Sequence, residues 1–142
     1  MIAVDTNLLV YAHRTAVPEH RRARDAIQAA ADDPRGWGIV LSSLLEFWAV
    51  VTHPSAPRPS TPKEVTSFIA TLIDDGGAAI WFPGAGFHAR LLRSATDLRV
   101  SGARIFDLQI GLVALENGAR EIWTHDRGFV TPPGLRLVNP LA

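Results

Sequence analysis

The sequence contains no cysteine, and only one of its fourteen basic residues, Lys63, is a lysine. Without cysteine the chain can form neither a disulfide framework nor a thiolate metal site, and it has no cysteine nucleophile. The formal net charge at pH 7 is zero. No overall field therefore attracts a polyanion, and any such contact would depend on local patches of charge.

Long hydrophobic runs are also missing. The longest apolar stretch, residues 39–51, is interrupted by Ser42, Ser43 and Glu46 and is too short to span a bilayer. The first residues enter an apolar segment at once, without the basic region of a signal peptide. We therefore expect no membrane association and a cytoplasmic location.

The 142 residues, 47% of them apolar, are sufficient for one hydrophobic core and predict a single domain over residues 1–142. Strand-like segments alternate with helical patterns along the chain. This alternation predicts a three-layer α/β/α fold with a four- to five-stranded, mainly parallel sheet. The expected strands are 2–4, 38–41, 79–82, 121–124 and 135–138, and the expected helices are 6–12, 18–31, 43–51, 61–73, 87–96 and 105–117.

Three helix ends have recognisable signals. Ser43 with Glu46, and Thr61 with Glu64, each have the spacing of a capping box, in which two side chains satisfy the first backbone N–H groups of a helix. Glu46 therefore has a structural explanation. The helix over 105–117 is apolar almost all round, which predicts a buried central position, and Gly118 is expected to end it.

Four acidic residues each fall at a strand end or in the first turn of the next helix: Asp5, Glu46, Asp107 and Asp126. In a parallel sheet these positions share one edge. Carboxylates about 5 Å apart repel by roughly 3 kcal/mol per pair at an effective dielectric near 20, so such a cluster requires raised pKa values or a cation. Each acid alone also has an ordinary explanation: Asp5 as a helix N-cap, Asp107 beside a helix N-terminus, and Asp126 in a turn.

An all-oxygen ligand set without cysteine favours Mg²⁺ or Mn²⁺ over zinc. The chemistry that best uses such residues is phosphodiester hydrolysis by a metal-activated water. The arginines that could guide a nucleic acid by its phosphates are Arg14, Arg21, Arg22 and Arg104.

The order and spacing of four segments resemble the PIN-domain ribonucleases, specifically the VapC-type toxins of toxin–antitoxin pairs. The segments are residues 2–7, residues 42–46, Asp107 and residues 122–129, so the resemblance covers essentially the whole chain. It implies that Asp5, Glu46, Asp107 and Asp126 are catalytic metal ligands for Mg²⁺ or Mn²⁺, supported by Asn7 and Thr124. It also implies an RNA substrate such as tRNA or rRNA, a homodimer and a cognate antitoxin protein. One departure is that many relatives carry a further acid one turn after Asp107, where this chain has Ile110 and Gly111.

Two alternatives from other classes stay open. A non-catalytic α/β module that binds RNA or a protein could carry the same pattern. A receiver-like signalling domain would require a lysine near the acidic residues, but Lys63 falls at the start of a connecting helix. DNA as a substrate also stays open.

Overall fold

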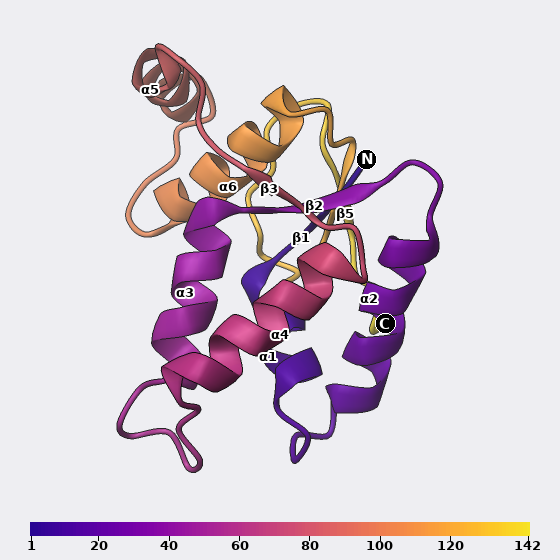
Figure 1. The fold of residues 1–142 in the computed structure, drawn as a ribbon. Helices are drawn as coiled ribbons and strands as arrows, with labels where there is room; N and C mark the ends of the chain where they lie inside the picture. Colours follow the sequence, from indigo (N-terminus) through magenta and orange to yellow (C-terminus); the bar gives the residue numbers. More distant parts are fainter.

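The computed structural model describes all 142 residues, which form one five-stranded sheet with helices on both of its faces (Figure 1). Every neighbouring pair of strands is parallel, which confirms the predicted sheet. The strand order is β3-β2-β1-β4-β5. The strands are β1 (Ile2–Val4), β2 (Trp37–Val40), β3 (Ala79–Trp81), β4 (Glu121–Trp123) and β5 (Arg136–Val138).

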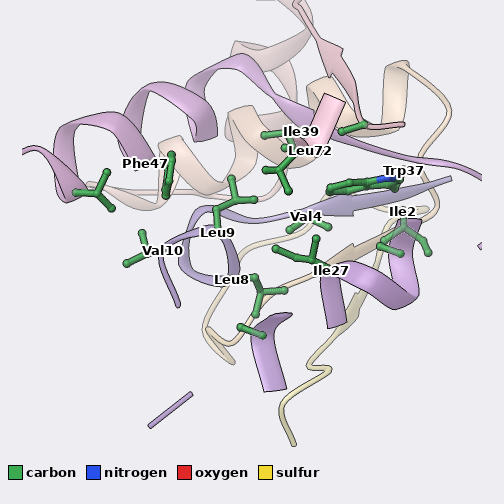
Figure 2. Packing of buried hydrophobic residues seen from close by; sticks show 14 of the residues in the cluster. Ile2, Val4, Leu8, Leu9, Val10, Ile27, Trp37, Ile39, Phe47 and Leu72 are labelled. Atoms are coloured by element: carbon green, nitrogen blue, oxygen red, sulfur yellow. The ribbon is translucent and has the colours of Figure 1, made fainter. Parts of the chain in front are cut away.

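The helices fill the two outer layers because successive residues of a strand point to opposite faces. Ile2 and Val4 of β1 join a core cluster with α1 to α4, shown in Figure 2, whereas Ala3 joins a second cluster with α5 and α6. This arrangement confirms the three-layer α/β/α prediction. The helices are α1 (Thr6–His13), α2 (His20–Asp32), α3 (Leu41–Val51), α4 (Pro62–Asp74), α5 (Phe87–Asp97) and α6 (Arg104–Glu116).

The strand order reverses direction at the centre of the sheet. The chain proceeds from β1 to β2 and β3 toward one edge, then returns to place β4 and β5 on the other side of β1. Open α/β sheets bind ligands at the carboxyl ends of the strands beside such a reversal. Asp5 directly follows β1, and Thr124 directly follows β4.

The predicted capping box at Ser43 and Glu46 is wrong. Helix α3 begins at Leu41, immediately after β2, so no loop remains in which Ser43 could act as a cap. Ser43 instead lies inside the first turn, where its hydroxyl is buried without a hydrogen-bond partner. The box at Thr61 and Glu64 is confirmed, with both reciprocal hydrogen bonds present.

Helix α6 is not buried all round, contrary to the prediction. It lies in an outer layer, so only one side contacts the sheet: Leu108, Val113 and Ala114 are fully buried, but Phe106 is 69% exposed. The helix ends near the expected residue, and Gly118 there has a φ of +100°. The second helix begins at His20 rather than at Pro18.

None of the helices combines the length and the apolar composition required to cross a membrane.

Candidate active site

The four predicted acids, which come from different parts of the chain, line a single cavity of about 690 Å³ beyond the carboxyl end of β1. No arginine, lysine or histidine lines this cavity, so its ionisable wall carries one sign of charge. The lining residues are Asp5, Thr6, Asn7, Val10, Tyr11, Ser42, Glu46, Val50, Ala103, Phe106, Asp107, Gln109, Ile110 and Asp126.

Asp5 is both a helix cap and a member of the cavity. One carboxylate oxygen, Oδ1, accepts a hydrogen bond of 2.8 Å from the backbone N–H of Thr6, as expected of the N-cap of α1. The other, Oδ2, accepts 2.8 Å from the hydroxyl of Thr124. The residue is only 7% exposed. Both carboxylate oxygens are therefore held in place, which orients the side chain toward the other acids.

Thr124 and Asn7 connect the ends of β1 and β4. The Thr124 hydroxyl oxygen accepts hydrogen bonds from Asn7 Nδ2 at 3.0 Å and from the backbone N–H of Asp126 at 3.1 Å. Asn7 Oδ1 in turn accepts from the backbone N–H of His125 at 3.1 Å. This network fixes the turn after β4 against α1 and brings Asp126 to the cavity, so Asn7 and Thr124 occupy supporting positions.

Glu46 on α3 and Gln109 on α6 both line the cavity. Glu46 lies in the second turn of α3, and the Thr6 hydroxyl lies 3.3 Å from Glu46 Oε2 and 3.3 Å from the Ser43 carbonyl oxygen. The Ser42 hydroxyl donates a 2.7 Å hydrogen bond to Gln109 Oε1, which joins α3 to α6. The sequence analysis missed this pair, although a lone glutamine within the apolar run 108–115 was an available signal.

Asp126 and Asp107 lie beside each other at the start of α6. Asp126 Oδ1 accepts a hydrogen bond of 2.8 Å from the backbone N–H of Gly128, as expected of an aspartate in a turn. Asp126 also lines the cavity. Arg104 donates 2.6 Å to the carbonyl of Gly128 and thereby ties the first turn of α6 to the same turn.

The cluster shifts the proton affinity of its buried members. The pKa of Asp5 is raised to about 6 in total. Burial is the largest cause, the hydrogen bonds from Thr124 and Thr6 oppose it, and the charges of Glu46 and Asp107 add to it. Burial likewise raises the pKa of Asp107, and the charge of Asp126 adds to this effect. Electrostatic repulsion therefore acts between Glu46 and Asp5, between Asp5 and Asp107, and between Asp107 and Asp126.

The donor set fits a hard divalent cation that keeps part of its water shell. No three acidic or histidine side chains already converge as a complete metal site. Mg²⁺ is commonly held by only one or two carboxylates, with water completing its coordination. Of the four carboxylates, Asp5 is buried, Asp107 is half-buried, and Glu46 and Asp126 are exposed. Together they provide the oxygen ligands and the negative charge that such an ion requires, with no cationic side chain among the residues that line the cavity.

The four arginines that could guide a nucleic acid lie at different distances from the cavity. Arg14 donates 3.2 Å to the carbonyl of Val50, a lining residue, and Arg104 lies by the turn of Asp126. Arg22 instead donates 2.8 Å to the carbonyl of Leu141, and Arg21 is exposed on α2. Their contact with phosphates stays a prediction.

Solved structures with the same fold cover almost the whole chain. VapBC2 from Rickettsia felis, bound to a DNA fragment from its promoter, gives a TM-score of 0.66 at 19% identity and covers 98% of each chain. VapC20 from Mycobacterium tuberculosis, a toxin that cleaves the sarcin-ricin loop, gives 0.65 at 16% identity over 94% of this chain and 100% of that chain. FitAcB from Neisseria gonorrhoeae gives 0.63 at 18% identity over 99% of this chain and 98% of that chain.

Sequence relatives agree with the structural likeness. A VapC ribonuclease of Mycobacterium bovis is 32% identical over 142 residues, which cover 99% of this chain and 96% of that protein. Ribonuclease VapC48 of Mycobacterium tuberculosis is 24% identical over 139 residues, which cover 97% and 96%. The profile of the PIN domain matches residues 2–134, so this chain, with its four acids around one cavity, belongs to the PIN domain family.

Proposed function

We propose that this protein is the toxin of a type II toxin–antitoxin pair, an endoribonuclease of the cytoplasm that depends on Mg²⁺ or Mn²⁺. The ribonuclease activity is supported by relatives that are named VapC ribonucleases at 32% identity over nearly the full length of both chains. The substrate is RNA, with tRNA and rRNA as the candidate classes.

One observation carries the chemical part of this proposal. Four carboxylates that are widely separated in the sequence line one cavity that contains no cationic side chain. Neighbouring carboxylates raise one another's proton affinity, and burial adds to this cost at Asp5, yet folding has gathered the four acids at the sheet edge where ligands bind. A bound divalent cation would compensate this charge and bridge the cavity to a phosphate.

The roles of the residues follow from their contacts. Asp5, Glu46, Asp107 and Asp126, which all line the cavity, would hold the ion directly or through water. Such an ion supplies activation of water as a nucleophile and neutralises charge on the phosphate oxygens. Thr124 and the backbone of Thr6 fix the rotamer of Asp5, and Asn7 fixes Thr124.

We also propose a cognate antitoxin protein as partner and a homodimer as the assembly. The antitoxin is supported by the names of the relatives and by the likeness to the VapBC2 and FitAcB structures. The homodimer rests on the resemblance of the sequence.

The test is cleavage of total cellular RNA by the purified protein, with Mg²⁺, with Mn²⁺ and with a chelator, followed by mapping of the cut ends. Asp5→Asn and Asp107→Asn should each lower the rate by more than about a hundredfold, because even the residues that only support metal ligands are worth tenfold to a hundredfold. Asp74→Asn, an exposed acid at the end of α4, is the matched control and should leave the rate unchanged.

A second readout separates metal binding from catalysis. Mg²⁺ alone, without RNA, should raise the melting temperature of the wild type more than that of Asp5→Asn, because a ligand that binds only the folded state stabilises it. Full cleavage activity in either site variant contradicts the assignment. A wild type that binds RNA but cuts none, with every ion tested, identifies the non-catalytic binding module instead. The receiver-like alternative is disfavoured because Lys63, the only lysine, does not line the cavity.

A further inference from the structure

Phe106 is the most exposed of the large hydrophobic side chains, at 69%. It lies in the first turn of α6, directly before Asp107, and it lines the acidic cavity. Burying a phenylalanine side chain stabilises a fold by about 1.5–3 kcal/mol, and folding does not use that contribution here. Single exposed apolar residues are ordinary on protein surfaces, so the position of the ring beside the acids, rather than its exposure, is the informative feature.

The lining of the cavity mixes acidic and apolar side chains from the same elements. Val50 lies one turn after Glu46 on α3, Val10 and Tyr11 lie on α1, and Ala103, the N-cap of α6, lies three residues before Phe106. Because no arginine or lysine is among the lining residues, charge pairing with RNA phosphates is confined to the rim of the cavity, where Arg104 lies. Contacts to the RNA bases therefore become important for placing the scissile phosphate.

A nucleobase is the part of RNA that complements the apolar side chains beside the acids, Phe106 above all. Unstacked bases are commonly held on aromatic rings, and alanine substitution of such rings costs about 1–3 kcal/mol per base. Arg104, two residues before Phe106, is exposed and lies by the turn of Asp126, where it can contact a phosphate of the same strand.

We propose that the ring of Phe106 stacks on a nucleobase that flanks the scissile phosphate and thereby determines which RNA positions are cut. This inference rests on the proposed ribonuclease function and deepens it. Bases inside a duplex are stacked on their own neighbours, so the base on Phe106 must be unpaired. The protein should thus select unpaired nucleotides at the cut.

The test uses a short RNA oligonucleotide with the sequence at the mapped cut, either unpaired or annealed to its complement. Phe106→Leu keeps an apolar side chain but removes the aromatic face, and Phe106→Trp retains an aromatic face. Phe82→Leu is the matched control, since Phe82 is 57% exposed but does not line the cavity. Because both rings are exposed, all three variants should fold with melting temperatures close to the wild type.

The wild type should cleave the unpaired RNA faster than the duplex. Phe106→Leu should lower kcat/KM on the unpaired RNA by about tenfold to a hundredfold, the loss expected from one stacked base, whereas Phe106→Trp and Phe82→Leu should stay close to the wild type. On an oligonucleotide that lacks the flanking base, kcat/KM of the wild type should fall to the value of Phe106→Leu. The kcat/KM of Phe106→Leu should be the same with and without this base.

Equal kcat/KM for the wild type and Phe106→Leu on the unpaired RNA overturns the proposal. A loss in Phe106→Leu that is equally large on the RNA without the flanking base also overturns it. If Phe106→Leu cleaves normally but is no longer inhibited by the antitoxin, the ring belongs to a protein interface and the proposal is wrong. A wild type that cuts no RNA with any divalent ion refutes the ribonuclease function itself, which distinguishes the two failures.

Discussion

At the scale of single residues, Asp5 combines a stabilising hydrogen-bond pattern with an unfavourable charge. Its two oxygens accept from Thr6 and Thr124, yet burial and the neighbouring acids raise its pKa to about 6 from an ordinary value of 3.8. The folded state therefore binds a proton that the unfolded state has lost between about pH 4 and pH 6. In this window the contribution of Asp5 to stability falls as the pH rises.

We predict that this effect can be measured without divalent metal. From pH 4 to pH 7 the free energy of unfolding of the wild type should fall by about 2–3 kcal/mol relative to that of Asp5→Asn, since one pKa unit corresponds to about 1.4 kcal/mol. Urea denaturation at several pH values checks the difference. Asp74→Asn should follow the wild type, and a constant offset between the wild type and Asp5→Asn across the pH range would show that Asp5 does not titrate in this window.

At the scale of elements, the contact between α6 and the segment after β4 explains why no acidic residue stands at Gly111, one turn after Asp107. A Cβ atom added to Gly111 would lie 2.7 Å from Cδ of Pro132 and 3.3 Å from Cδ2 of Leu135. No side chain fits at this position without a shift of the proline ring. Ile110 lines the cavity and supplies no oxygen, so the acids of this site number four.

Gly111→Ala should therefore destabilise the protein. Alanine gains up to about 1 kcal/mol in helix propensity, but overpacking against a rigid ring costs about 1–3 kcal/mol, so we expect a net loss of about 1 kcal/mol in the free energy of unfolding. Denaturant titration of the single variants and of Gly111→Ala with Pro132→Ala gives the coupling between the two positions. Additive effects would mean that the proline does not cause the loss.

The sequence was sufficient to predict the helices, the strands and the acidic residues of the site, but not the side-chain contacts between the helices that line the cavity. Asp5 follows β1 and Asp126 follows β4, so the parallel sheet brings these two acids to one edge. Asp107 lies in the first turn of a helix that follows α5 rather than a strand, so its place at the same edge depends on how α6 packs. The start of α3 was not predictable from local signals, because the direct passage from β2 into the helix overrides the capping preference of Ser43. The Ser42 and Gln109 contact depends on how α3 and α6 face each other, which short-range spacing does not encode.

At the scale of the whole molecule, the amino ends of the strands are joined by one buried carboxylate. Glu121, the first residue of β4, accepts hydrogen bonds from Arg35 at 2.9 Å, from Arg136 at 2.6 Å and from Trp123 Nε1 at 3.0 Å. The hydrogen bonds from Trp123 and Arg136 are the main causes that lower the pKa of Glu121 to about 2. This carboxylate lies at the other end of the strand from the acidic cavity.

We predict that Glu121→Gln lowers the free energy of unfolding at pH 7 by about 1–2 kcal/mol, discounted because both arginines are partly exposed. Because the pKa of Glu121 is lower in the folded state than in the unfolded state, its charge stabilises the fold above about pH 4.5. This stabilisation is lost as the pH falls toward 2, so the stability of Glu121→Gln should depend less on pH in this range than that of the wild type. Urea titrations from pH 7 to pH 2.5 check both effects. Glu116→Gln removes a more exposed carboxylate, 27% against 11% for Glu121, that pairs with Arg90 alone. This variant should cost less than about 1 kcal/mol, and a similar cost for both variants would refute the prediction.

The position of β1 between β2 and β4 also governs when the proposed nuclease could become active during its own synthesis. Asp5 leaves the ribosome long before its hydrogen-bond partner Thr124, which follows 119 residues later, and Asp126 follows later still. A nascent chain that has reached only α5 or α6 therefore lacks one side of the cavity and the strand that supports it. Translation can proceed through β4 before the chain is able to attack the RNA around it.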